Sequence, residues 1–353
     1  MDSSSPSLGP PVITTAHLEA FLPAAMDSTV DQGRLEHIQL APGRFSADLV
    51  RIHSGTTRFD WGNYNLPVHA HGDMPADRIT LGLVQSAHGD GILNGRGLQH
   101  AQLALYTEGS ELDYRLATQT RWSALQVDRA TLDRLGVHCP PRQCGIVIAA
   151  PAATSRVAQL TEQLVAAASP TAAGDDPTGR AFSVQGMLQG LLAAFATALP
   201  QALAAGGHCA TGRQRLAVSR ARDYLHGHFN EAIRVTDLCA AAGTSVKTLE
   251  RAFVTLLGVT PQRYLMLARL SHASRMLLAQ DRAETTVAAV AYASGVFSSQ
   301  PLQPRVHRPV RRAPVLDVGP HGLNREVPLL AAQRRRIASQ RQKLSRLASE
   351  AAT

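Results

Sequence analysis

One stretch, residues 235–264, constrains this chain of 353 residues more than any other. A short helical run ends at Ala242 and is followed at once by Gly243, which supplies the left-handed backbone that ends a helix. Thr244 or Ser245 can then cap a following helix by accepting backbone N–H bonds. The stretch therefore predicts two short helices joined by a tight turn.

The second helix of this pair is predicted to have one buried and one exposed face. Its apolar residues recur at the three- and four-residue spacing of an amphipathic helix: Val246, Leu249, Ala252, Phe253, Leu256 and Leu257. Gly258 ends the run, and Pro261 opens another helix because proline at the first position loses no bond that the helix needs. This is the plan of a helix-turn-helix unit, whose second helix enters the major groove of DNA.

A helix pair with a glycine turn also occurs in proteins that never meet DNA, so the spacing alone leaves both interpretations open. The wider sequence favours DNA. It resembles the AraC/XylS family of bacterial transcription regulators at residues 221–225, Leu238, Ala241, Ala242, Ser245, Leu249, Arg251, Phe253, Gly258, Pro261, Tyr264, 268–270, Ala273, Leu277, Leu278, Thr286, Val287, Val290, Ala291 and Gly295.

The resemblance implies an α+β architecture, with a β-rich, jelly-roll or cupin-like sensor domain followed by an all-α helix-turn-helix domain and an irregular basic tail. We expect a loose segment at residues 1–40, an effector-binding and dimerisation domain at 41–205, the DNA-binding domain at 213–300 and an Arg/Pro-rich tail at 301–353. The implied partners are double-stranded DNA, a small organic effector and a second copy of the chain, with RNA polymerase left open.

The resemblance also assigns roles on the first recognition helix. The base-reading side is expected to consist of Lys247, Glu250 and Arg251. The phosphate-contacting side is expected to consist of Thr244, Ser245 and Thr248. Tyr264 and Arg269 are expected to be structural. Base and phosphate contacts are not separable from sequence, so either role stays open for each residue.

Charge is divided unevenly along the chain. Residues 1–212 hold 13 Lys and Arg against 18 Asp and Glu, residues 213–282 hold 11 against 5, and residues 296–353 hold 11 against 3. The helix-turn-helix region and the tail are thus basic, while the front of the chain is mildly acidic. This is the electrostatic footprint of a protein that binds a phosphate backbone.

Residues 45–128 consist of short β-branched or alternating runs separated by glycine and polar clusters, a pattern typical of a β-sandwich or barrel. Asn94-Gly95 predicts a tight hairpin within this region. An effector pocket here would draw on its aromatic and histidine side chains: Trp61, Tyr64, His69, His71, Tyr106 and Trp122. Each of the aromatic residues serves equally well as core.

His69 and His71 form an H-x-H pair, which in cupin enzymes binds a metal together with a carboxylate and a later histidine. The glutamate and glycines of the enzymatic pattern are not at their places, so we expect a metal-free pocket, no cofactor and no catalysis. The alternative is a metal-dependent cupin-type enzyme fused to a DNA-binding module. The cysteines, Cys139, Cys144, Cys209 and Cys239, lack the spacing of a zinc site and are expected to be free thiols.

Residues 155–205 predict two helices, the second of which is apolar around much of its circumference and must bury more than one face. No apolar run reaches the eighteen or so residues of a membrane helix, and no export signal is visible, so a cytoplasmic location is expected.

The chain departs from the family after about residue 296. Pro301, Pro304 and Pro309 fall where a second recognition helix belongs, and proline inside a helix costs about 3 kcal/mol. A shifted reading frame and a natural basic tail both explain the change. A third interpretation of the whole chain is therefore a decayed regulator with impaired DNA binding.

Overall fold

The structure is a computed structural model. It describes residues 10–86, 91–98, 100–141, 144–147, 149–169, 177–204, 212–229, 231, 233–279, 290 and 293–295. These residues all belong to one compact unit, Met1–Val296. The interrupted second recognition helix, the basic tail and Cys209 lie outside the described residues.

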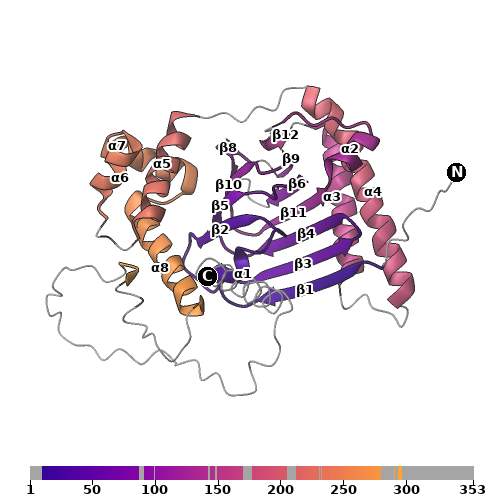
Figure 1. Cartoon of the computed structure of the whole chain (residues 1–353), viewed down its shortest axis with the longest axis horizontal. Helices are drawn as coiled ribbons and strands as arrows, with labels where there is room; N and C mark the ends of the chain where they lie inside the picture. Colours follow the sequence, from indigo (N-terminus) through magenta and orange to yellow (C-terminus); the bar gives the residue numbers. More distant parts are fainter. Residues whose placement is uncertain are drawn as a thin grey trace, which may run out of the picture. The chain divides into compact units, whose positions relative to one another are not determined.

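The first part of the chain forms two antiparallel sheets (Figure 1). Sheet A has seven strands in the order β1 (Val12–Leu18), β3 (Ala47–Ser54), β4 (Thr57–Tyr64), β11 (Thr120–Val127), β6 (Ile79–Ser86), β9 (Ala101–Tyr106) and β12 (Cys144–Val147). Sheet B has five strands in the order β2 (Arg34–Gln39), β5 (Val68–Asp73), β10 (Glu111–Leu116), β7 (Ile92–Leu93) and β8 (Arg96–Gly97). The β-rich front predicted from the sequence is confirmed.

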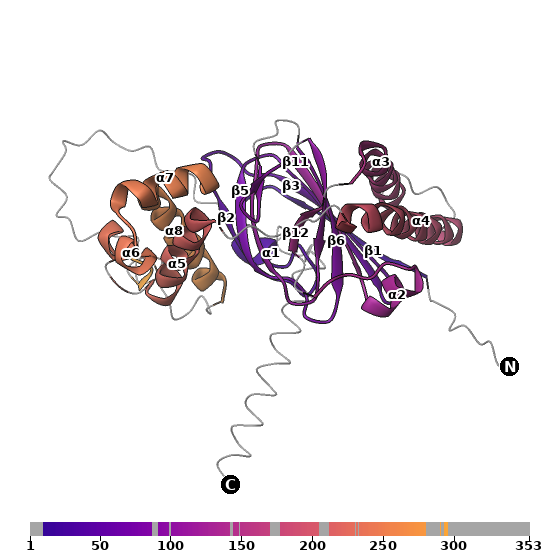
Figure 2. The same ribbon diagram turned by 90° about the horizontal axis from the view of Figure 1, so that it is seen from above.

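Alternation along the strands gives sheet A two different faces, because successive side chains point to opposite sides. Leu81, Leu83 and Leu125 belong to a core shared with helices α3 (Pro151–Ala168) and α4 (Pro177–Ala204), which lie against this outer face (Figure 2). The intervening residues, such as Gly82 and Val84, face sheet B across a cavity. Sheet A is therefore the middle layer between sheet B and the helix pair.

Helix α4 corrects one expectation. Within the described part of the chain, it is a helix long and apolar enough to cross a membrane, since Thr178–Pro200 has a mean hydropathy of 1.4. Gln189 and Pro200 lie within this stretch, but its mean hydropathy is still high enough for a membrane-spanning helix. A third of this stretch is buried, and five of its side chains lie in the core with sheet A: Val184, Leu188, Leu191, Phe195 and Leu199.

The N-terminal segment is also more ordered than expected. The prediction of a loose segment at residues 1–40 is wrong for β1, helix α1 (Pro23–Met26) and β2. Pairing with β3 and β5 fixes these strands, and such long-range pairing leaves little periodic signal in the strands themselves. By contrast, the hairpin at Asn94-Gly95 is confirmed, with φ angles of 46° and 79° in the turn between β7 and β8.

The helical part follows the predicted plan closely. It consists of α5 (Arg213–Gly227), α6 (Val235–Ala242), α7 (Val246–Leu257) and α8 (Pro261–Ala279). Gly243 and Gly258 adopt φ angles of 63° and 72° at the ends of α6 and α7, the left-handed conformation that glycine favours. Leu238, Leu249 and Phe253 are buried in a core that all four helices share.

Helices α5 and α8 contact the outer face of sheet B, which carries many ionisable side chains. The nearly fully buried Arg222 of α5 donates to Asp113 of β10 at 2.5 Å. The Tyr264 hydroxyl of α8 lies 3.2 Å from Nδ1 of His69 on β5. Residues that are distant in sequence thus hold the helices to the sandwich through polar contacts.

Candidate nucleic-acid interface and effector cavity

The exposed face of α7 is the candidate DNA-binding surface. Lys247, Glu250, Arg251 and Val254 stand at positions i, i+3, i+4 and i+7, so they lie on one side of the helix, and all four are exposed. Neither Lys247 nor Arg251 forms a hydrogen bond or ion pair with another residue that the structure describes. This side of the helix is therefore available to a partner.

Local interactions determine where α7 begins and which of its faces is buried. The hydroxyl of Ser245 accepts the backbone N–H of Thr248 at 3.3 Å and so caps the helix. On the opposite side, Leu249, Phe253 and Leu257 are buried against the other helices. The ring of Phe253 meets that of Tyr264 on α8 edge to face, with centroids 5.5 Å apart. The buried face thus sets which side chains are presented outward.

The predicted contact residues divide by their place on α7. Glu250 and Arg251 project from the body of the helix, whereas four residues lie in or just before its first turn: Thr244, Ser245, Lys247 and Thr248. Arginine and lysine bond the edge of guanine, and glutamate accepts from cytosine. Backbone N–H groups and hydroxyls at a helix N-terminus suit phosphate.

Sequence reasoning missed two apolar side chains on this surface. Val246 was expected to be buried but is 44% exposed, and Val254 is 51% exposed. Val246 stands at the start of the helix, before the turn that packs on α5 and α6. Apolar side chains on a recognition helix can contact the methyl group of thymine. Only a projection of all residues of α7 around the helix axis would have shown that these two side chains lie outside the buried face.

A cavity of about 50 Å³ lies between the two sheets. Its lining is apolar, with Val84 and Trp122 on sheet A and Leu112 and Tyr114 on sheet B. The buried hydroxyl of Thr80 has no hydrogen-bond partner among the described residues, and it belongs to the same lining. The cavity therefore combines apolar walls with at least one buried group able to bond a ligand.

Only part of the predicted effector set meets at this cavity. Tyr106 and Trp122 line it, and Tyr64 contacts Trp122 with ring centroids 6.0 Å apart. Trp122 lies across Gly62, where a Cβ atom would come within 2.6 Å of the indole nitrogen. These three aromatic side chains thus belong to the inner side of the sandwich.

The other three predicted effector residues lie elsewhere, which corrects the expectation of one shared pocket. Trp61 is packed in the core with α3 and α4, on the outer face of sheet A. His69 and His71 lie on the outer face of sheet B, where they contact Tyr264 and His226. The physical reason is strand alternation: one residue of offset moves a side chain to the other face of a sheet.

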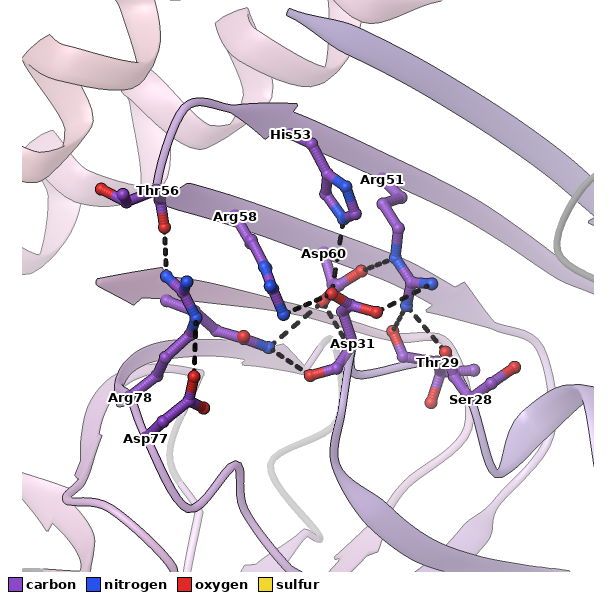
Figure 3. Close-up of polar contacts among 11 residues, drawn as sticks. Ser28, Thr29, Asp31, Arg51, His53, Thr56, Arg58, Asp60, Asp77 and Arg78 are labelled. Carbon is purple, nitrogen blue, oxygen red and sulfur yellow. Dashed lines mark hydrogen bonds and ion pairs between the residues drawn. The ribbon is translucent and has the colours of Figure 1, made fainter. Parts of the chain in front are cut away.

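A network of charged side chains joins the segment around Asp31 to strands β3 and β4 (Figure 3). Arg51 of β3 donates to Asp60 of β4 at 2.5 Å and to the backbone oxygen of Ser28 at 2.7 Å. Arg58 donates to Asp31 at 2.7 Å. The segment between Ser28 and Asp31 is thereby tied to sheet A, and its residue Val30 lines the cavity.

Asp60 is the most buried acid of this network, with 1% of its surface exposed. Burial raises the pKa of its carboxyl group to about 6, against the opposing effects of the Arg51 guanidinium and of the Asp31 N–H, which donates at 2.8 Å. The charge of this carboxyl is therefore sensitive to its surroundings in the range just below neutral pH.

The same segment also contacts helix α8. Asp27 accepts two hydrogen bonds from Arg275 of α8, at 2.7 and 3.0 Å. Only Ser28 and Thr29 separate Asp27 from Val30 in the cavity wall. A change in the cavity could thus reach α8 along a few residues of backbone.

The chain is a protein of the helix-turn-helix class. It has the two helices joined by a glycine turn, and the exposed face of its capped second helix, α7, carries Lys247 and Arg251. A family model described as a helix-turn-helix domain matches residues 238–308. The probable thc operon regulatory protein of Rhodococcus erythropolis is 36% identical over 80 residues. The match to the family model falls on the part of the chain where the sequence resembles the AraC/XylS family of transcription regulators.

The comparisons differ in how much of the chain they cover. The alignment with the Rhodococcus protein spans 23% of this chain and 23% of that protein. Among solved structures, ToxT of Vibrio cholerae bound to an unsaturated fatty acid is 9% identical, with 81% of this chain and 87% of that chain covered and a TM-score of 0.26. ToxT bound to a naphthalenyl butenoic acid gives 9% identity, 81% and 90% coverage, and a TM-score of 0.24.

Proposed function

We propose that this protein is a sequence-specific DNA-binding transcription regulator that reads an operator with α7. The observation that carries the proposal is the exposed row of Lys247, Glu250, Arg251 and Val254 on a helix whose opposite face packs in the core of the four helices. A surface with donors, an acceptor and an apolar group matches the mixed pattern of base edges in the major groove. Ser245 and Thr248 would add phosphate contacts at the N-terminus of the helix.

We further propose that a small, largely apolar molecule binds between the two sheets and controls DNA binding. The apolar lining and the buried Thr80 hydroxyl favour a ligand with one polar group. Its binding would displace Val30, and the segment 27–31 would transmit the shift to Arg275 of α8. The ligand would thereby change the balance between arrangements of the helices.

The remaining parts of the function follow from the family. As a bacterial regulator the protein would act in the cytoplasm, as a homodimer and without catalysis. The domain boundaries at residues 41–205 and 213–300 belong to the same proposal. Contact between α4 of two copies would cover Phe182, which is 72% exposed. The size of a DNA complex would test the dimer.

A binding selection tests the DNA-reading proposal. The full chain would select duplexes from a random library, and the selected sequence would be titrated at several salt concentrations. Arg251→Ala should weaken binding by about 1–3 kcal/mol and relax the preference at one base position. Arg156→Ala, which removes an exposed arginine on α3, is the matched control and should change neither. Equal weakening on all sequences would instead assign Arg251 to phosphate, and no selected sequence at all would refute the proposal.

A further inference from the structure

Three potential metal ligands meet on the outer face of sheet B. Glu36 of β2 and His71 of β5 are direct cross-strand partners, and His226 of α5 joins them from the helical part. Their candidate ligand atoms all lie within 4.8 Å of one another. Nδ1 of His226 lies 3.0 Å from a carboxylate oxygen of Glu36, and the rings of His71 and His226 are 4.9 Å apart.

The cluster contains two buried ring nitrogens. Nδ1 of His71 and Nε2 of His226 are both buried, and neither has a hydrogen-bond partner among the residues that the structure describes. A buried polar atom without a partner costs about 1–3 kcal/mol, so a pair of them in one cluster requires an explanation. A bound ion would supply one, because a metal takes up imidazole nitrogens directly or reorients the rings.

We propose that Glu36, His71 and His226 bind a divalent transition-metal ion, with Zn²⁺ as the ion that suits them best. Two imidazoles and one carboxylate are an established zinc ligand set that leaves further positions for water. Zinc bonds of about 2.1 Å in tetrahedral geometry put neighbouring ligand atoms about 3.4 Å apart. The Glu36–His226 separation already approaches this value, so a small movement of His71 completes the set.

The electrostatic surroundings fit a cation. Two arginines act on the site, Arg222 on His71 and Arg275 on Glu36, and each has an acidic partner. Arg222 pairs with Asp113 at 2.5 Å, and Arg275 pairs with Asp27 at 2.7 Å. Glu36 therefore leaves the immediate site negative.

This site differs from the enzymatic arrangement considered from the H-x-H pair. His69 is not a ligand here, since its nitrogens lie 3.3 Å from Asp113 and 3.2 Å from Tyr264. One ligand comes from α5 rather than from the sandwich, so the ion would clamp the first helix of the DNA-binding part to sheet B. An effect of the ion on DNA affinity rests on the proposed function, whereas the site itself does not.

The test uses the full chain without an affinity tag. Calorimetric titration with Zn²⁺ should show one ion per chain, and Co²⁺ should give the visible absorption of a four- or five-coordinate site. His71→Ala, His226→Gln and Glu36→Gln should each weaken Zn²⁺ binding by more than about 100-fold, beyond the loss caused by removing an outer-sphere partner. His17→Ala, which removes an exposed histidine of β1, is the control and should bind like the wild type.

Circular dichroism of the metal-free variants would establish that each one folds. Absence of saturable binding to the wild type, or unchanged binding in the three folded variants, would overturn the site. A separate titration with the selected DNA, with and without Zn²⁺, measures the coupling. Loss of DNA binding with an intact Zn²⁺ site would refute the proposed function and leave the metal site standing.

Discussion

The two sheets of the sandwich have outer faces of opposite character. The outer face of sheet A carries residues such as Ile52, Leu81 and Leu125, all without exposed surface, and α3 and α4 cover it. The outer face of sheet B carries Glu36, His71 and Asp113 in one cross-strand row, and α5 and α8 contact it.

We interpret the contact of α3 and α4 with sheet A as permanent, and the contact of α5 and α8 with sheet B as one that can open. Exposing the apolar face of sheet A to water would lose the main free energy of folding. The ion pairs on sheet B can instead be hydrated when α5 and α8 move away, which offsets much of the loss. Ile38 and Leu40 add only a small apolar contact there. We therefore interpret the sheet B contact as the one that regulation acts on.

The largest effect is expected at the buried ion pair between the sandwich and α5. Asp113→Ala leaves the guanidinium of Arg222, which is 2% exposed, without its main partner, at a cost of about 3–5 kcal/mol. Because α5 can move into water, hydrogen exchange should rise in α5 and stay unchanged in sheet A. Equal acceleration in both regions would contradict a separable contact.

Leu125→Ala should act on the whole sandwich instead. This side chain has no exposed surface and packs in the core of sheet A, α3 and α4, so its truncation should lower the free energy of unfolding by about 2–5 kcal/mol. Chemical denaturation followed by circular dichroism would measure the change. Leu135→Ala, at a position 46% exposed, should cost far less.

The pH dependence of stability tests the inner side of sheet A. The pKa of Asp60 is raised from 3.8 to about 6, so the folded state binds its proton more tightly than the unfolded state does. This contribution is fully present below pH 3.8 and is lost as the pH rises through 6, by about 3 kcal/mol at 1.36 kcal/mol per pKa unit. Subtracting the unfolding free energy of Asp60→Asn at each pH should isolate that decline. A flat difference would contradict the raised pKa.

A smaller effect is expected from the apolar residue on the reading face. Val254→Ala removes two methyl groups from an exposed position, so stability should stay within about 0.5 kcal/mol. Affinity for the selected DNA should fall by roughly 1 kcal/mol if Val254 contacts a thymine methyl group. Anisotropy titration would measure this, and loss of folding stability in place of affinity would place Val254 in the core.

Local chemistry made the helical part predictable. The left-handed glycines Gly243 and Gly258, the Ser245 cap and the apolar spacing of α7 all act within a few residues. The Asn94-Gly95 hairpin was predictable for the same reason. In these places the structure is determined by interactions between residues that are close together in the sequence.

Long-range pairing accounts for what the sequence did not reveal. Trp61 and Trp122 look alike in sequence, but the strand alternation sends them to opposite faces of sheet A. Likewise, His71 and His226 are brought together by the packing of α5 on β5. No local pattern indicates which face a strand buries when both faces are covered, or which helix lies against it.

Lys247 offers the most direct test of the claim that α7 faces DNA. The chain contains two lysines, Lys247 and Lys343, so modification by an amine-reactive reagent can be followed at each by mass spectrometry. At a salt concentration that abolishes non-specific binding, the selected DNA should protect Lys247 several-fold, with the N-terminal amine as the unprotected reference. Modification of Lys247 at the same rate in free and DNA-bound protein would contradict the account.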